Sequence, residues 1–292
     1  MKAILVHLNG TRSDLAVLNG ALSLARLFNA HLQCTHVVPD KHTLLMRATN
    51  VDLTSTMMLT DALHKLQEEA QKRLSHAREM FFAFCEDQHV PHHDTPHDGG
   101  LVSASWHDQV GKPAAVLTRQ VRCNDLIVME AGPRDDPLFS SDDIADVIAG
   151  AGRPVLLAPP HAQIDVKSIA IAWKNCPEAA RAVSAALPLL AKAQKIIALS
   201  ASEQRGSAAE TAESLSGITN YLAWHGLRAE SVCLTPGKNR TAADAVLETA
   251  IESQAGLLVM GGFGHGRLRE FVFGGFTQRV LDGVVIPVLL VH

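Results

Sequence analysis

Aromatic residues are scarce in this 292-residue chain, where Phe, Trp and Tyr together make up 4% of the sequence. This scarcity argues against a carbohydrate groove or a platform for single-stranded nucleic acid, because such surfaces rely on stacking. An excess of one charge is lacking too, since 26 Lys and Arg stand against 30 Asp and Glu, giving a net charge of −4. Without a strong overall field, neither nucleic acid nor an anionic membrane is an expected partner. Any anion site must be local.

Paired cysteines and long apolar runs are also missing. The five cysteines are widely spaced and form no C-x-x-C pair, so we expect reduced side chains in a cytoplasmic protein. The apolar run that follows Met1 is too short for a signal peptide and has no small-residue cleavage site. The most apolar long stretch, 183–201, is interrupted by Lys192 and Lys195, which argues against a membrane span.

What the chain does contain is a repeated unit. At 47% hydrophobic residues and this length, two globular domains are expected. Three segments of the first half recur in the second, and the matched pairs are 4–9 with 169–174, 126–129 with 257–260, and 154–157 with 287–290. Extra chain around 40–77 lengthens the first half. We therefore predict one domain at 1–160 and another at 166–292, joined near Pro159-Pro160.

Each half alternates short apolar runs with amphipathic helices, which is typical of a parallel sheet covered on both faces. Strands are expected at 3–8, 31–38, 102–106, 125–129, 154–158, 168–173, 196–200, 229–234, 257–260 and 287–291. Helices are expected at 14–28, 57–87, 113–121, 178–193, 208–225 and 242–254. The prediction is an α/β protein with two Rossmann-like, doubly wound domains in tandem, each with a five-stranded parallel sheet in the order 3-2-1-4-5.

A glycine-rich loop follows the fourth predicted strand of the second half. Gly261 and Gly264 open it, and Gly274 and Gly275 stand where a helix is expected to begin. Glycine lets the backbone approach a ligand closely, and the unpaired N–H groups at a helix start attract anions. In a doubly wound sheet, ligands bind beyond the carboxyl ends of the strands, where the strand order reverses. With three Arg and one Glu in 261–279, this loop is predicted to cradle an anion.

At these residues the sequence resembles the universal stress protein family. The family's nucleotide motif, G-x2-G-x9-G-(S/T), is present as Gly261-x2-Gly264-x9-Gly274, and the Pro-Val-Leu-Leu-Val of 287–291 is similar to the family's usual ending. The resemblance covers both halves. It implies a tandem stress-response protein that forms a pseudo-dimer, with or without further dimerisation. It also implies a protein that binds an adenine nucleotide, ATP alone or with Mg²⁺, and acts by binding.

Two positions depart from the family pattern. The acid expected after the first strand of a domain is Asn9 in the first half and Lys174 in the second, and the Ser or Thr after the last motif glycine is Gly275. Lys174 offers a charge to a phosphate instead, and Thr277 offers a hydroxyl. The predicted nucleotide-binding residues are Ala172, Trp173, Lys174, Ser200, Gly261, Gly264, His265, Gly274, Gly275 and Thr277.

The matching loop of the first half is acidic. Residues 130–143 hold five Asp and Glu against one Arg, and Ser140 to Asp143 replace the second pair of glycines. Carboxylates at a helix start suit the helix dipole and repel phosphate. The first domain is therefore predicted to keep the fold with a degenerate nucleotide loop.

The sequence signals for other kinds of chemistry are weaker. One cluster of polar side chains contains residue types that bind metal ions: His89, His92, His93, Asp94, His97, Asp98 and His107. Two prolines and the lack of helical spacing favour a solvated loop for this segment, so no metal site is predicted.

No catalytic motif emerges, so no catalytic residue is predicted. The alternatives are a ligand-free pseudo-dimeric interaction module and a weak ATPase or other hydrolase. The apolar positions of 57–87 predict core packing, with a lid or a partner-binding helix as the alternative.

Overall fold

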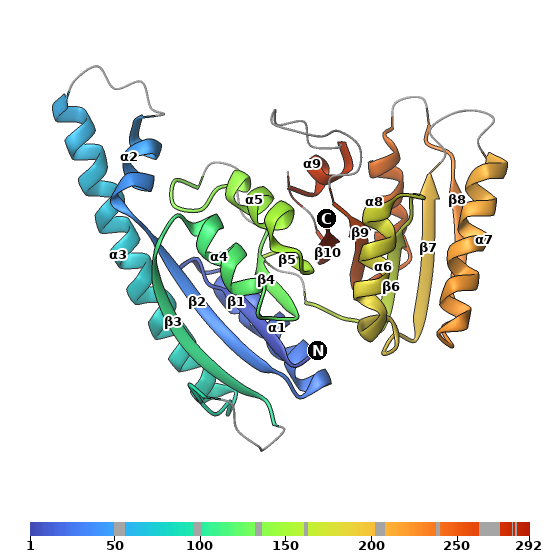
Figure 1. Ribbon diagram of the computed structural model, residues 1–292, viewed down its shortest axis with the longest axis horizontal. Coiled ribbons are helices and arrows are strands. Elements are labelled where there is room, and N and C mark those ends of the chain that lie inside the picture. The colour runs from blue at the N-terminus through green and yellow to red at the C-terminus, as the bar shows by residue number, and fades with distance from the viewer. Residues whose placement is uncertain are drawn as a thin grey trace. The chain divides into compact units, whose positions relative to one another are not determined.

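The computed structural model is an α/β protein (Figure 1). It describes residues 1–49, 56–95, 101–131, 136–160, 163–201, 208–237, 240–262, 275–281, 283 and 285–292. The chain divides into two compact units. Unit 1 is Met1–Arg153 with Ala158–His161, and unit 2 is Pro154–Leu157 with Ala162–His292. No helix in the described segments combines the length and the apolar character that a membrane span needs.

Unit 1 is built on a parallel sheet flanked by helices. Its strands are β1 (Ala3–His7), β2 (His31–Pro39), β3 (Ser103–Gly111) and β4 (Leu126–Glu130), and β5 (Val155–Ala158) follows. Its helices are α1 (Asp14–Phe28), α2 (Lys41–Thr49), α3 (Thr56–Asp87), α4 (Pro113–Val121) and α5 (Ser141–Ala151). Strand β1 lies between β2 and β4, with Ile4 opposite both Leu32 and Leu126. The interiors of β1 and β4 are fully buried, which fits their continuous apolar runs.

Unit 2 repeats the pattern. Its strands are β6 (Ser168–Ala172), β7 (Lys195–Ala201), β8 (Glu230–Leu234), β9 (Leu257–Gly261) and β10 (Val288–Val291). Its helices are α6 (Pro177–Leu190), α7 (Ala208–Trp224), α8 (Ala242–Glu252) and α9 (Gly275–Leu281). Strand β6 pairs in parallel with β7 and with β9, and β9 pairs with β10. Residues 155–157 of β5 pair antiparallel with β10, which is why this short segment belongs to unit 2.

The mostly parallel α/β fold is confirmed. The strands are hydrogen-bonded in one series, β3-β2-β1-β4-β5-β10-β9-β6-β7-β8, and each half of that series has the order 3-2-1-4-5. The prediction of two separate five-stranded sheets is not confirmed, because β5 and β10 share backbone hydrogen bonds. The physical reason is that an apolar edge strand leaves unpaired N–H and C=O groups, and another strand satisfies them.

Two elements of unit 1 differ from the sequence prediction. Strand β3 runs on to Gly111, because all nine of its residues pair with β2, although its second half alternates with polar residues. Helix α2 was not predicted. It begins after Asp40, whose carboxylate accepts the Thr43 N–H at 2.8 Å, and Leu44 packs it against Ala70 of α3. The sequence contains the capping residue Asp40, but it does not indicate that α2 packs against α3.

Helix α3 lies along β2 and β3 (Figure 1). The prediction that its apolar positions face the core is correct for Ala77 and Phe81, which are fully buried. It is wrong for Met57 and Met58, which are 78% and 54% exposed. These two residues lie in the first turn of the helix.

Two buried titratable residues flank the end of β1. Burial, together with a smaller repulsion by His36, lowers the pKa of His7 from 6.5 to about 3. Burial raises the pKa of Asp14 from 3.8 to about 7, against the opposing effect of the N–H groups of Asn9 and Gly10, each 2.8 Å from its carboxylate. Unit 1 therefore holds one imidazole that resists protonation and one carboxyl group that resists ionisation.

These shifts predict how stability depends on pH. Between about pH 3 and 6.5, only the unfolded state protonates His7, so this residue makes stability rise with pH. Between about pH 4 and 7, only the folded state keeps Asp14 protonated, so this residue makes stability fall with pH. The two slopes, each about 1.4 kcal/mol per pH unit, cancel where the windows overlap. For Asp14→Asn, urea denaturation between pH 4 and 6.5 should show a steeper rise in stability than the parent chain; an unchanged slope would contradict the assignment.

Candidate functional site

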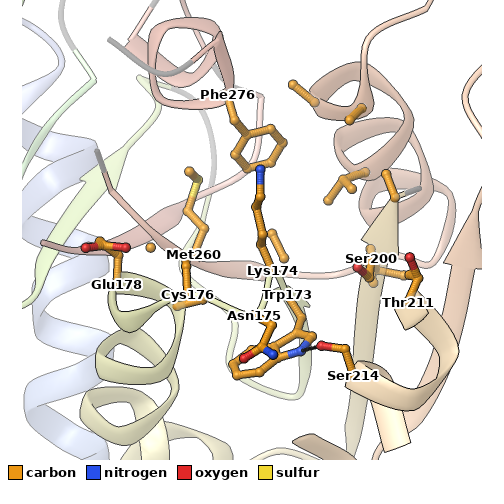
Figure 2. Close-up of a pocket in the computed structure, with 18 of the residues that line it drawn as sticks. Trp173, Lys174, Asn175, Cys176, Glu178, Ser200, Thr211, Ser214, Met260 and Phe276 are labelled. Atoms are coloured by element: carbon orange, nitrogen blue, oxygen red, sulfur yellow. Dashed lines mark hydrogen bonds between the residues drawn. The ribbon is translucent and has the colours of Figure 1, made fainter. Parts of the chain in front are cut away.

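A cavity of about 770 Å³ lies in unit 2, where the carboxyl ends of β6, β7 and β9 come together (Figure 2). The first turns of α6, α7, α8 and α9 complete its walls. Seven of the ten predicted nucleotide-binding residues line it: Ala172, Trp173, Lys174, Ser200, Gly261, Gly275 and Thr277. The other three, Gly264, His265 and Gly274, lie outside the described residues. Segments far apart in the chain thus converge on one space.

Trp173 forms one wall of this cavity and is held at two points. Its backbone N–H donates to the carbonyl oxygen of Leu199 at 2.7 Å, which ties the end of β6 to β7. Its indole N–H donates to the Ser214 hydroxyl at 2.8 Å, across to α7 (Figure 2). Ser214, Thr211 and Phe276 also line the cavity and are not among the residues predicted from the sequence. The sequence contains one indication of such a residue, because the indole N–H of Trp173 needs a hydrogen-bond acceptor when it is partly buried.

The start of α6 brings a carboxylate to the cavity. Burial of Glu178 works against its ionisation, but hydrogen bonds from its own backbone N–H and from the Cys176 thiol, together with Arg181 at 3.0 Å, lower its pKa. Cys176 is the residue before the first turn of this helix. Glu178 is therefore ionised at neutral pH, with its charge shared among partners on its own helix start.

Gly261, which is a motif glycine, and Gly275, which stands at the motif's Ser/Thr position, differ in what surrounds them. A Cβ on Gly261 would lie 2.6 Å from the backbone nitrogen of Ala179, so β9 can approach the start of α6 only with glycine at this position. A Cβ on Gly275 would meet no described atom within 4 Å. Packing within unit 2 explains Gly261, whereas no described atom is close enough to explain Gly275 in the same way.

The charges around the cavity are mixed. Lys174, just beyond β6, extends across the cavity toward Phe276 of α9 (Figure 2). Glu178 and Glu210 are the other charged residues among the described lining. Arg279, which contributes to the positive count of the glycine loop, donates to Asp244 at 3.1 Å and to the Gly283 carbonyl, and it is not part of the lining. The positive charge of the described cavity wall therefore comes from Lys174.

Sequence comparison assigns this part of the chain to a family. The model of the universal stress protein family matches residues 166–292, the segment that holds the cavity. Residues 166–292 form a universal stress protein domain. No curated protein sequence matches the chain.

Solved structures match over nearly the whole length of the chain. A universal stress protein from Archaeoglobus fulgidus DSM 4304 superposes with a TM-score of 0.64 at 14% identity, covering 99% of this chain and 97% of that one. A protein of unknown function from Pseudomonas aeruginosa PAO1 superposes with a TM-score of 0.56 at 16% identity, covering 100% and 92%. At such identities the likeness concerns the fold alone, and it extends the similarity beyond the universal stress protein domain to unit 1.

In unit 1, a carboxylate of the protein itself lies at the position that corresponds to the glycine loop of the universal stress protein domain. Asp136 accepts the backbone N–H groups of Leu138 and Phe139 at 2.8 and 3.2 Å, just before α5. The Arg73 guanidinium donates to both of its oxygens, at 3.0 and 2.7 Å, and the Asn9 amide donates at 3.3 Å. Backbone N–H groups, a guanidinium and an amide are donors that attract anions, and here they converge on the Asp136 carboxylate.

Helix α5 is also capped by its own side chains. Ser140 and Asp143 form a reciprocal capping box, and the Asp143 carboxylate pairs with Arg47 at 2.6 Å. The start of this helix is thus satisfied internally. The carboxylates of this acidic loop are evident in the sequence, whereas the arginines that pair with them, Arg73 and Arg47, were not predicted.

The histidine-rich segment shows ordinary polar contacts. His92 lies 3.4 Å from the Asp94 carboxylate, and His107 lies 3.2 Å from the Ser105 hydroxyl. His97 and Asp98 fall outside the described residues. Among the residues that the structure describes, no three His, Cys, Asp or Glu side chains are grouped so as to hold a metal ion.

Proposed function

We propose that this chain is a cytoplasmic tandem universal stress protein, with domains at 1–160 and 166–292, that binds an adenine nucleotide, ATP above all, in its C-terminal domain. One observation carries the proposal: seven residues predicted from the nucleotide motif and its surroundings line one cavity of a universal stress protein domain. A volume of about 770 Å³ lies within the range of small-molecule sites. The five unpaired cysteines suit a reducing compartment.

The proposed arrangement follows from the chemistry of the walls. The adenine would lie against the ends of β6 and β7, beside Ala172, Trp173 and Ser200, where the methyl group and the indole ring offer apolar surface. The phosphates would face the glycine loop, where no described atom lies within 4 Å of the Cβ position of Gly275 and where Thr277 supplies a hydroxyl. The absence of an evident base and nucleophile in the sequence favours action by binding, in a stress response, over rapid turnover.

We propose that the N-terminal domain does not bind nucleotide. The supporting observation is the Asp136 network, in which a protein carboxylate takes the backbone N–H groups ahead of α5. The Gly10 carbonyl, which faces the same region, already pairs with His76 of α3 at 2.9 Å. The repeat would thus serve as a pseudo-dimer partner for the C-terminal domain.

The first test is for bound nucleotide. Mass spectrometry of small molecules released from the freshly purified, denatured protein should detect an adenine nucleotide, and calorimetry should detect ATP binding. The ligand-free interaction module predicts neither result. A weak ATPase predicts phosphate release that persists through further purification and disappears when the cavity is blocked.

Blocking the cavity gives the sharper prediction. In Gly275→Val the new side chain enters space that holds no described protein atom, so the fold should survive while ATP binding is lost. Gly237→Val is the matched control, because Gly237 is exposed, has no described atom within 4 Å of its Cβ position and lies outside the cavity lining. Calorimetry at millimolar ATP should show binding for the control alone. Equal binding by both variants would place the nucleotide elsewhere.

A further inference from the structure

Lys174 occupies a special position at the cavity. It follows β6, which lies between β7 and β9, so it sits where the strand order reverses. The backbone on both sides of it is fixed, since Trp173 donates to Leu199 and the Cys176 N–H donates to the Lys174 carbonyl, each at 2.7 Å. Figure 2 shows its side chain crossing the cavity toward Phe276, near the start of α9. A cation is therefore presented to the side of the cavity where the phosphates are proposed to lie.

The carboxylates around the cavity are poorly arranged for a divalent cation. Mg²⁺ in nucleotide sites is usually held by one or two carboxylates together with the phosphates. The Glu178 carboxylate is already shared by the Cys176 thiol and Arg181. Asp244, on α8 beside the cavity, caps its own helix and accepts from Arg279. Glu210 is the remaining carboxylate of the described lining, and the other acidic residue of α7, Glu213, is not part of that lining.

We propose that the Lys174 ammonium, in place of a divalent cation, neutralises the phosphate chain, so that the domain binds metal-free nucleoside polyphosphates. This inference rests on the proposed function, because it concerns the same cavity. It is chemically consistent, since a lysine acts as a point charge for phosphate oxygens and needs no octahedral ligand set. A fixed cation also makes affinity grow with the negative charge of the ligand. ATP should therefore bind more tightly than ADP, and ADP more tightly than AMP.

The experiment is calorimetry of the full chain with ATP, in EDTA and in excess Mg²⁺. Binding in EDTA should be as tight as in Mg²⁺ or tighter, because Mg²⁺ removes part of the charge that Lys174 attracts. Lys174→Met should weaken ATP binding in EDTA by about tenfold or more and reduce the preference for ATP over AMP. Lys174→Arg should retain most of the affinity.

The control is Lys195→Met. Lys195 is exposed at the amino end of β7, the opposite end from the cavity, and should leave affinity and metal dependence unchanged. If ATP binds only with Mg²⁺, or if Lys174→Met binds like the parent chain, the inference is overturned while the proposed function stands. If no ATP binds in either buffer, the proposed function fails as well.

Discussion

Replacing Gly10 with alanine is expected to destabilise the protein by about 2–4 kcal/mol. Gly10 has φ of +74°, and a Cβ there would meet the Cβ, backbone oxygen and Cα of Arg73 at less than contact distance. The turn after β1 is thus covered directly by the backbone of α3, and a methyl group would push the helix away. Scanning calorimetry of Gly10→Ala should show a clear fall in melting temperature relative to the parent chain.

Gly226 provides a closely matched control. It also has φ of +74°, but no described atom lies within 4 Å of its Cβ position. Gly226→Ala therefore carries the backbone cost alone, about 1 kcal/mol. Equal losses for the two variants would mean that contact with α3 does not require the glycine.

The second large effect is expected at Asp136. Asp136→Ala would leave the Arg73 guanidinium, 15% exposed, without its main partner and would free two backbone N–H groups at Leu138 and Phe139. Removing one member of a buried ion pair typically costs 3–5 kcal/mol, because the other charge stays desolvated. A loss of about that size is expected in urea denaturation.

The control is an exposed ion pair of the same unit. Lys112 and Asp146 are 3.2 Å apart, with side chains 58% and 55% exposed, so Asp146→Ala should cost less than about 1 kcal/mol. Acetate or formate should recover part of the stability lost in Asp136→Ala, because a small carboxylate can take the vacated contacts. A small loss, with no recovery by either anion, would show that the network contributes little.

Much of the fold was predictable because local signals agreed with the tertiary structure. Helices α1 and α4 have the predicted bounds, since their apolar periodicity ends at clear boundaries. The sequence predicts too short a β3, because the second half of this strand is half-exposed and contains polar residues. Its actual length is determined by pairing with nine residues of β2. Pairing of this kind depends on the neighbouring strand, which no window of sequence around β3 contains.

The candidate site was predictable to the extent that topology determined it. Residues after β6, β7 and β9 converge because parallel strands end at the same edge of a sheet. Ser214 was missed because it enters from a helix, through a hydrogen bond to Trp173. Arg73 was missed for a similar reason: it lies 63 residues before Asp136, and only the path of α3 brings the two together.

The antiparallel pairing of β5 with β10 has a consequence for dissecting the protein. The sequence repeat suggests a cut at Pro159-Pro160, yet residues 155–157, which unit 2 uses as a strand, come before that point. A C-terminal fragment that starts after the prolines would keep the cavity and the glycine loop but expose three apolar residues of β10 along a bare edge. The repeating unit of the sequence and the compact unit of the structure therefore differ by one strand.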